Sequence, residues 1–164
     1  MIPGPIQTAG YIRTLLEAIR DRRGLVDDID ASVKVRLDKQ ERALHGPGGR
    51  RFAIVLEESA LRYRIGEAEM LAAQLGHLLG VASLPSVSLG IIPEVAGRRA
   101  LWPVEGFFLF DDGLVNVELV SAHLTITQPS EIAMYARTFA DLSAMAVHGR
   151  DARSLIAAAM ASIG

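Results

Sequence analysis

Four short runs rich in β-branched and apolar residues lie in the middle of the chain, each bounded by turn residues. They are Ser86–Ile92, Glu105–Phe110, Val115–Val120 and Ala122–Thr127. Runs of this length and composition are typical of β-strands. Because no helical period separates them, the pattern predicts that the four strands form one antiparallel meander. Asp111-Asp112-Gly113 fits a tight hairpin turn within this region, with Gly113 supplying the positive φ that such turns need.

A helical period recurs in five other segments, where apolar residues are spaced three and four positions apart. These segments are 11–23, 30–44, 67–81, 129–145 and 152–163. The first ends before Gly24, Asp30 is a candidate cap for the second, and Pro129 sits after Gln128 at a favourable first-turn position. The fourth presents a face that we expect to be buried. It consists of Ile132, Tyr135, Ala136, Phe139, Leu142 and Met145.

The order of these elements predicts the fold class. Phe52–Leu56 is a short apolar run that we interpret as a buried strand, joined to the meander through the 67–81 helix. A connection of that kind places the two strands parallel by a right-handed crossover. The order lacks a strict strand–helix alternation, so we predict an α+β fold, with a mixed, largely antiparallel sheet of about five strands covered by helices. The 164 residues are expected to form one domain, residues 1–164.

Composition excludes several classes of protein. A net charge of −2 gives no electrostatic reason to bind nucleic acid directly. The absence of cysteine excludes disulfides, thiolate metal sites and a cysteine nucleophile, and it suits a reducing cytoplasm. No apolar run approaches the roughly 18 residues of a membrane span. We therefore expect a cytoplasmic protein that does not enter a membrane.

The first candidate site is the pair Glu57 and Glu58, at the end of the Phe52–Leu56 strand, with Arg62 close behind. Carboxylates at the C-terminal end of a strand are well placed for a crevice site, and one with a raised pKa could act as a general base. The alternative is structural, with one carboxylate capping the following turn and the other solvated or paired with an arginine.

The histidines do not have metal-ligand spacing, so no metal or other cofactor is expected. His123 in a predicted strand is kept as a further acid–base candidate. Gln74 and His77 are three positions apart on one helix and therefore share a face. That pair could line a ligand pocket, or it could be a polar flank of the helix.

The second candidate site surrounds the only tryptophan. Arg98 and Arg99 precede Trp102, and a basic pair beside an indole can bind an anion or stack on a planar ligand. Glu105 and Phe107 follow on the adjoining strand and would extend this wall of a ligand site. The same residues could also be a solvated loop with the indole packed over the edge of the sheet.

The chain resembles the C-terminal domain of unknown function that follows a helix-turn-helix in many actinobacterial XRE-family regulators of the Scr1-type, antitoxin-like group. The resemblance is carried along the whole chain by IPGPIQTAGYIRTLL, VKVRLDKQERAL, FAIVLEESALRYRIG, VSLGIIP, WPVEGFFLFDD, ITQPSEIAMYARTFADL and GRDARSLI. In the family pattern, Glu58 belongs to an acidic-A-L-R stretch that ends here at Arg62, and Trp102 begins the W-x-x-E-G-F stretch.

The resemblance implies a regulatory domain that senses a small molecule or binds a partner, and that forms homodimers. Relatives carry a DNA-binding helix-turn-helix before this domain, whereas here Met1 directly precedes IPGPIQT. The sequence is therefore either the effector part of a regulator or a stand-alone copy that does not bind DNA by itself. Two alternatives remain open: a small-molecule enzyme that recruited the domain, and an antitoxin-like module that binds a small partner protein.

Overall fold

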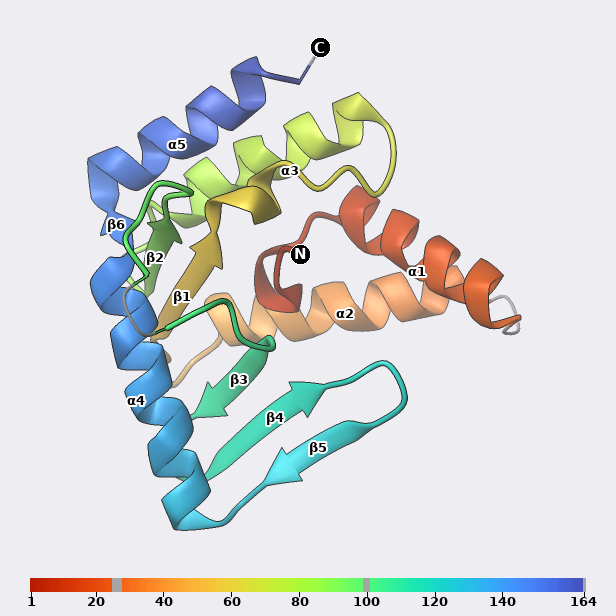
Figure 1. Cartoon of the computed structure of the whole chain (residues 1–164). Helices are drawn as coiled ribbons and strands as arrows, with labels where there is room; N and C mark the ends of the chain where they lie inside the picture. Colours follow the sequence, from red (N-terminus) through yellow and green to blue (C-terminus); the bar gives the residue numbers. More distant parts are fainter. Residues whose placement is uncertain (25–27, 99–100, 164) are drawn as a thin grey trace. The chain divides into compact units, whose positions relative to one another are not determined.

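The computed structural model describes residues 1–24, 28–98 and 101–163, and the fold is α+β as predicted (Figure 1). Contacts within the chain define two compact units. The first unit consists of Met1–Glu94 together with Val147–Gly164, and the second unit is Val95–Ala146. Each unit contains its own three-stranded sheet.

The N-terminal part of the first unit is helical. A short 3₁₀ turn, η1 (Gly4–Ile6), leads into α1 (Ala9–Arg23), and α2 (Ile29–Leu44) packs against α1. The hydroxyl of Thr8 caps α1 by accepting a hydrogen bond from the Tyr11 N–H at 3.2 Å. Gly24, with φ of +64°, ends this helix in the left-handed region, which a glycine adopts without steric cost. The predicted end of the first helix is thus confirmed.

The sheet of the first unit is mixed. Strands β1 (Phe52–Glu57) and β2 (Val87–Ile92) pair in parallel, from Phe52 opposite Val87 to Glu57 opposite Ile92. The connection between them runs through η2 (Glu58–Leu61) and α3 (Ala68–Val81), which confirms the predicted parallel crossover. The two-residue strand β6 (Val147–His148) pairs antiparallel with the other edge of β2, and α5 (Gly149–Ala161) follows it directly.

One hydrophobic core holds the first unit together. Leu71, Leu75 and Leu78 form the buried face of α3, as their helical spacing predicts, and they pack with Ile91 of β2 and Ile156 of α5. The N-terminal segment contributes to the same core. Its members there are Ile2, Ile6 and Tyr11, each at most 1% exposed.

The second unit is an antiparallel meander covered on one face by a helix. It contains β3 (Phe107–Phe110), β4 (Leu114–Glu118), β5 (His123–Ile126) and α4 (Pro129–Met145) (Figure 1). Val115 and Val117 point from β4 toward Ile132 of α4, and these three residues form the buried centre. Since side chains alternate along a strand, the neighbouring residues of each strand lie on the opposite, outer face of the sheet.

The predicted four-stranded meander is wrong in its first member. Val87–Ile92 does not pair with the next strand along the chain but lies between β1 and β6. Five of its six residues are buried, as expected of a central strand that is covered on both faces. The described residues therefore form two sheets of three strands, rather than one sheet of about five.

Three local predictions also need correction. The second helix begins at Ile29 after Asp28, so Asp30 lies in the first turn and is not the cap. In the β3–β4 turn, the left-handed residue is Asp111, with φ of +51°, and Gly113 is not in that region. Of the predicted buried face of α4, only Ile132 is buried. Tyr135, Phe139, Leu142 and Met145 are half-buried, and Ala136 is exposed.

Candidate functional site

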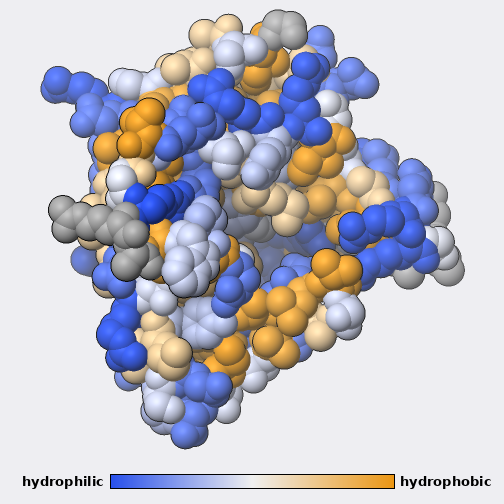
Figure 2. Space-filling view, viewed as in Figure 1, coloured by the Kyte–Doolittle hydropathy of each residue, from blue (hydrophilic) through white to orange (hydrophobic). Residues whose placement is uncertain are grey.

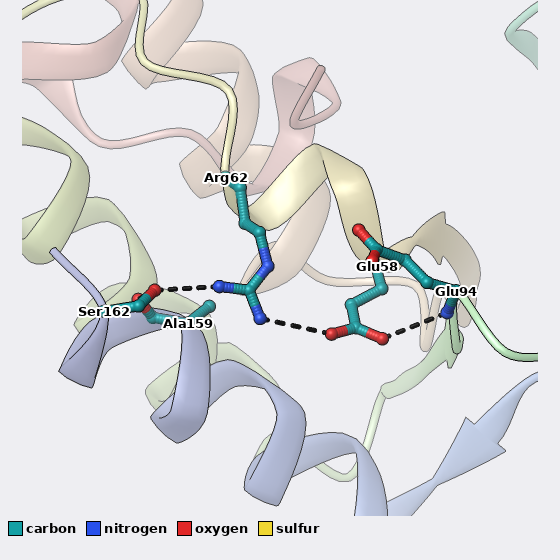
Figure 3. Close-up of polar contacts among 5 residues, drawn as sticks. All are labelled: Glu58, Arg62, Glu94, Ala159 and Ser162. Atoms are coloured by element: carbon teal, nitrogen blue, oxygen red, sulfur yellow. Dashed lines mark hydrogen bonds and ion pairs between the residues drawn. The ribbon is translucent and has the colours of Figure 1, made fainter.

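The C-terminal ends of the parallel strands β1 and β2 bring a carboxylate and a backbone amide together. Glu58 follows β1 directly, and Glu94 lies two residues beyond β2. The Glu94 N–H donates a hydrogen bond to Oε2 of Glu58 at 3.0 Å (Figure 3). Oε1 of the same carboxylate accepts from the guanidinium of Arg62 at 3.3 Å, an i,i+4 ion pair. The Glu58 side chain is 12% exposed, so this carboxylate is largely shielded from water.

Arg62 extends this cluster to the end of α5. Its second terminal nitrogen donates to the Ser162 hydroxyl at 2.8 Å, and that hydroxyl donates to the Ala159 carbonyl oxygen at 2.7 Å (Figure 3). Ser162 lies 100 residues from Arg62 in the sequence. We call Glu58, Arg62, Glu94 and Ser162 the strand-end cluster.

The hydrogen bonds of the strand-end cluster decide what its carboxylate can do. Each oxygen of Glu58 already accepts a hydrogen bond from a group of the same unit. A general base must instead direct an oxygen at a substrate proton. The geometry therefore favours the structural interpretation of Glu58, in which it joins η2 to the segment after β2, while Arg62 joins η2 to the end of α5. Glu57 is half-buried as the last residue of β1.

Gln74 and His77 share α3 but differ in their surroundings. Gln74 is fully buried, its Oε1 accepts from the Thr8 N–H at 2.7 Å, and its Nε2 donates to the Ile6 carbonyl oxygen at 2.8 Å. Its hydrogen-bonding capacity therefore serves the backbone of the N-terminal segment. His77 is exposed in part, and partial burial lowers its pKa below the ordinary value of 6.5.

Near the tryptophan, Tyr135 of α4 contacts both Glu105 and Phe107. The Tyr135 hydroxyl donates to Oε1 of Glu105 at 2.8 Å, and the rings of Phe107 and Tyr135 meet edge to face, with centroids 4.9 Å apart. The hydrogen bond to Glu105 is the main cause that raises the pKa of Tyr135 above its ordinary value of 10.0. Trp102 is 72% exposed.

Arg98 and His123 are the remaining predicted residues that the structure describes. Arg98 is half-buried in the second unit, and Arg99 lies outside the described residues. His123 is exposed on β5, opposite Glu118, and belongs to a different unit from Glu57 and Glu58.

Sequence reasoning missed Tyr135 as a polar group and Ser162 altogether. The spacing of Tyr135 places it in an apolar helical stripe, and no local pattern marks its hydroxyl as a hydrogen-bond donor. Ser162 meets Arg62 only because α5 folds back beside η2, so no local pattern marks it.

A polar depression of about 340 Å³ lies between α1 and α2. Its lining includes two arginines of α1, Arg13 and Arg20, and two carboxylates near the start of α2, Asp28 and Asp30. Arg13 and Asp30 form an ion pair across it.

Two further features bear on function. Within residues 1–24, 28–98 and 101–163, no three histidine, aspartate or glutamate side chains gather as they would around a metal ion. In the same ranges, each helix is too short or too polar to cross a lipid bilayer.

The chain has an α+β fold, with a parallel strand pair in its first unit and a three-stranded antiparallel meander in its second. The family model described as "Domain of unknown function (DUF5753)" matches residues 1–158. The chain therefore belongs to the DUF5753 family. No curated protein and no solved structure matches it.

Proposed function

We propose that the chain is a non-enzymatic regulatory domain of an actinobacterial XRE-type transcriptional regulator, and that it acts in the cytoplasm by binding another polypeptide. The observation that carries this proposal is the distribution of exposed apolar residues. Eight of the eleven exposed large hydrophobic side chains among the described residues belong to the second unit. They are Val95, Trp102, Phe108, Phe110, Leu119, Val120, Leu124 and Met134.

Single exposed apolar side chains are ordinary on a protein surface, but a concentration of them marks an interaction site. Figure 2 shows such side chains over β4 and its hairpin with β5, where Leu119 and Val120 are 43% and 86% exposed. Covering these residues with a partner would remove apolar surface from water, at about 25 cal/mol per Å². The exposed apolar side chains of the second unit would thus be more stable against a partner than in water.

The resemblance of the sequence to regulator domains supplies the biological setting. In that setting, a separate helix-turn-helix contacts DNA, and this chain sets the assembly state or senses a partner. The resemblance also implies a homodimer. A small-molecule enzyme is the less favoured alternative, because both oxygens of Glu58 are engaged within the strand-end cluster.

Native mass spectra of the purified chain, recorded over a range of concentrations, test the proposal. We expect either a dimer at twice the 17.7 kDa subunit mass or a complex with a second polypeptide. Replacing Val120 and Leu124 with threonine should weaken that assembly. The matched control is Val35→Thr, because Val35 is an exposed apolar residue of α2 in the first unit and should not affect assembly.

Two outcomes would contradict the proposal. A bare monomer at every concentration would argue against partner binding. A small molecule that stays bound in the native spectrum and is released on denaturation would support a sensor or enzyme instead.

A further inference from the structure

The outer face of the β3–β4–β5 sheet carries a contiguous apolar cluster. Phe107 and Leu109 pack in the cluster that contains Ile132 of α4. Because side chains alternate along a strand, Phe108 and Phe110 lie on the opposite, outer face. Phe110 is opposite Leu114 in the register, and Phe108 is opposite Asn116. The two phenylalanines are 42% and 51% exposed. We call Phe108, Phe110 and Leu114 the outer-face cluster.

The surroundings of the outer-face cluster are acidic. Asp111 and Asp112 form the turn at one end of it, and Glu118 projects from β4 on the same face, two residues beyond Asn116. Residues 107–126 contain no lysine or arginine. Over its whole length, the second unit holds six carboxylates against three arginines, a net charge of −3 at pH 7.

This combination of apolar and acidic groups limits which molecules can bind the outer-face cluster. Nucleic acid and an anionic membrane surface are both disfavoured, because their phosphates would meet carboxylates. A second copy of the same face would bring like charges together, which costs interaction free energy. A polypeptide with apolar anchors and flanking lysines or arginines is complementary in both respects.

The inner face of the same sheet shows what shape of partner fits. There α4 lies against β3 and β4 and buries Ile132 over Val115 and Val117. The outer face has the same strand geometry and no helix of this unit against it. A second amphipathic helix can therefore pack on it and complete a helix–sheet–helix arrangement.

Resting on the proposed function, we propose that the outer-face cluster is the docking site for a basic amphipathic helix of a partner protein. Apolar residues at positions i, i+3, i+4 and i+7 of that helix would cover Phe108, Phe110 and Leu114. Its lysines or arginines would face Asp111, Asp112 and Glu118.

A pair of labelled synthetic peptides tests this proposal by fluorescence anisotropy with the full chain. Both peptides are amphipathic helices of about five turns with leucine on one face, and the other face carries lysine in one peptide and glutamate in the other. We expect the lysine peptide to bind and to be weakened by added salt, because exposed charge pairs are screened. The glutamate peptide should bind at least about tenfold more weakly.

Variants locate the binding. Phe108→Thr with Phe110→Thr should weaken binding of the lysine peptide by about tenfold or more, as expected for buried aromatic anchors. Asp111→Asn with Asp112→Asn should weaken it by a few fold while keeping a residue that tolerates positive φ at position 111. Val35→Thr is the matched control, since Val35 is an exposed apolar residue of α2 in the first unit. This change should leave the affinity unaltered.

A direct map on the unaltered protein keeps the test informative if the double phenylalanine variant does not fold. Amide chemical shifts should change around Phe108, Phe110 and Leu114 when the lysine peptide is added. Shifts confined to other elements would overturn the proposal, as would equal binding of both peptides or no binding by the lysine peptide. The native spectra could instead show a dimer that the Phe108→Thr, Phe110→Thr change dissociates. The outer-face cluster would then bind a second copy of the chain. That result would reject the basic-helix proposal but would agree with the proposed function in polypeptide binding.

Discussion

The amide oxygen of Gln74, fully buried on α3, accepts a hydrogen bond from the backbone N–H of Thr8 at 2.7 Å, across 66 residues of the chain. The amide nitrogen of the same side chain donates to the Ile6 carbonyl oxygen at 2.8 Å. One glutamine thus satisfies two backbone groups of the segment that leads into α1. A buried polar side chain that meets its partners in this way specifies where the N-terminal segment sits against the core.

Replacing Gln74 with leucine should lower the free energy of unfolding by about 2 kcal/mol or more, because the Thr8 N–H and the Ile6 carbonyl would both lose their partners. Urea unfolding followed by circular dichroism measures this change. Gln128→Leu is the matched control, since Gln128 is exposed before α4 and its side chain makes no cap hydrogen bond. Equal stability of the Gln74 and Gln128 variants would show that the buried glutamine does not anchor the segment.

The strand-end cluster predicts a local effect on amide exchange. Glu58→Ala removes the acceptor of the Glu94 N–H, so hydrogen exchange at that amide should become faster, whereas Glu58→Gln retains an acceptor oxygen and should preserve most of the protection. Nuclear magnetic resonance detects exchange at this single amide. Unchanged exchange in Glu58→Ala would mean that the Glu58–Glu94 bond does not hold the strand end.

His77 predicts how stability depends on pH. Because burial lowers its pKa below 6.5 in the folded state, the unfolded chain binds the proton more readily. The contribution of His77 to stability is therefore complete above pH 6.5 and is lost as the pH falls from 6.5 through the folded-state pKa. His77→Gln should reduce the loss of stability over this window, as measured by urea unfolding on both sides of pH 6.5. An unaltered pH dependence in that variant would contradict the assignment.

The β3–β4 turn predicts a ranking of substitutions at Asp111. Its φ of +51° is costly for a β-branched residue and well tolerated by asparagine or glycine. Asp111→Val should therefore destabilise the protein by about 1–2 kcal/mol relative to Asp111→Asn. Thermal and urea unfolding of the two variants measure the difference. If Asp112→Val were equally destabilising, the loss would reflect β-turn composition in general and not the left-handed backbone at Asp111.

Local structure was largely predictable from the sequence, because helices and strands are encoded by the spacing of neighbouring residues. The end of α1 at Gly24, the start of α4 at Pro129 and the buried face of α3 all follow from such patterns. Which strands pair with one another was harder to predict from the sequence. Val87–Ile92 pairs with β1 and with the two-residue strand β6, and a strand as short as β6 has no period of its own to recognise.

In the candidate sites too, contacts between residues close in sequence could be predicted, whereas contacts that depend on tertiary packing could not. Glu58 and Arg62 stand four positions apart, and the sequence offered an ion pair as one interpretation of them. The contact of Arg62 with Ser162 depends on the packing of α5 and could not be predicted from either neighbourhood. Gln74 drew attention as a polar residue on a helix, but its burial against the N-terminal backbone is a tertiary property.

The pairing of β2 with β6 has a consequence for how such a chain can vary. Ile91 lies opposite Val147, so the backbone leaves the first unit and returns to it at adjacent positions of one hairpin, whose connection is the entire second unit. Because the two ends of this connection are adjacent, the second unit does not have to bridge any fixed distance. The hairpin accommodates a long connection as readily as a short one, apart from a slowly growing loop-closure entropy. The surface that we assign to partner binding can therefore change in length and composition while the central parallel pair keeps its register.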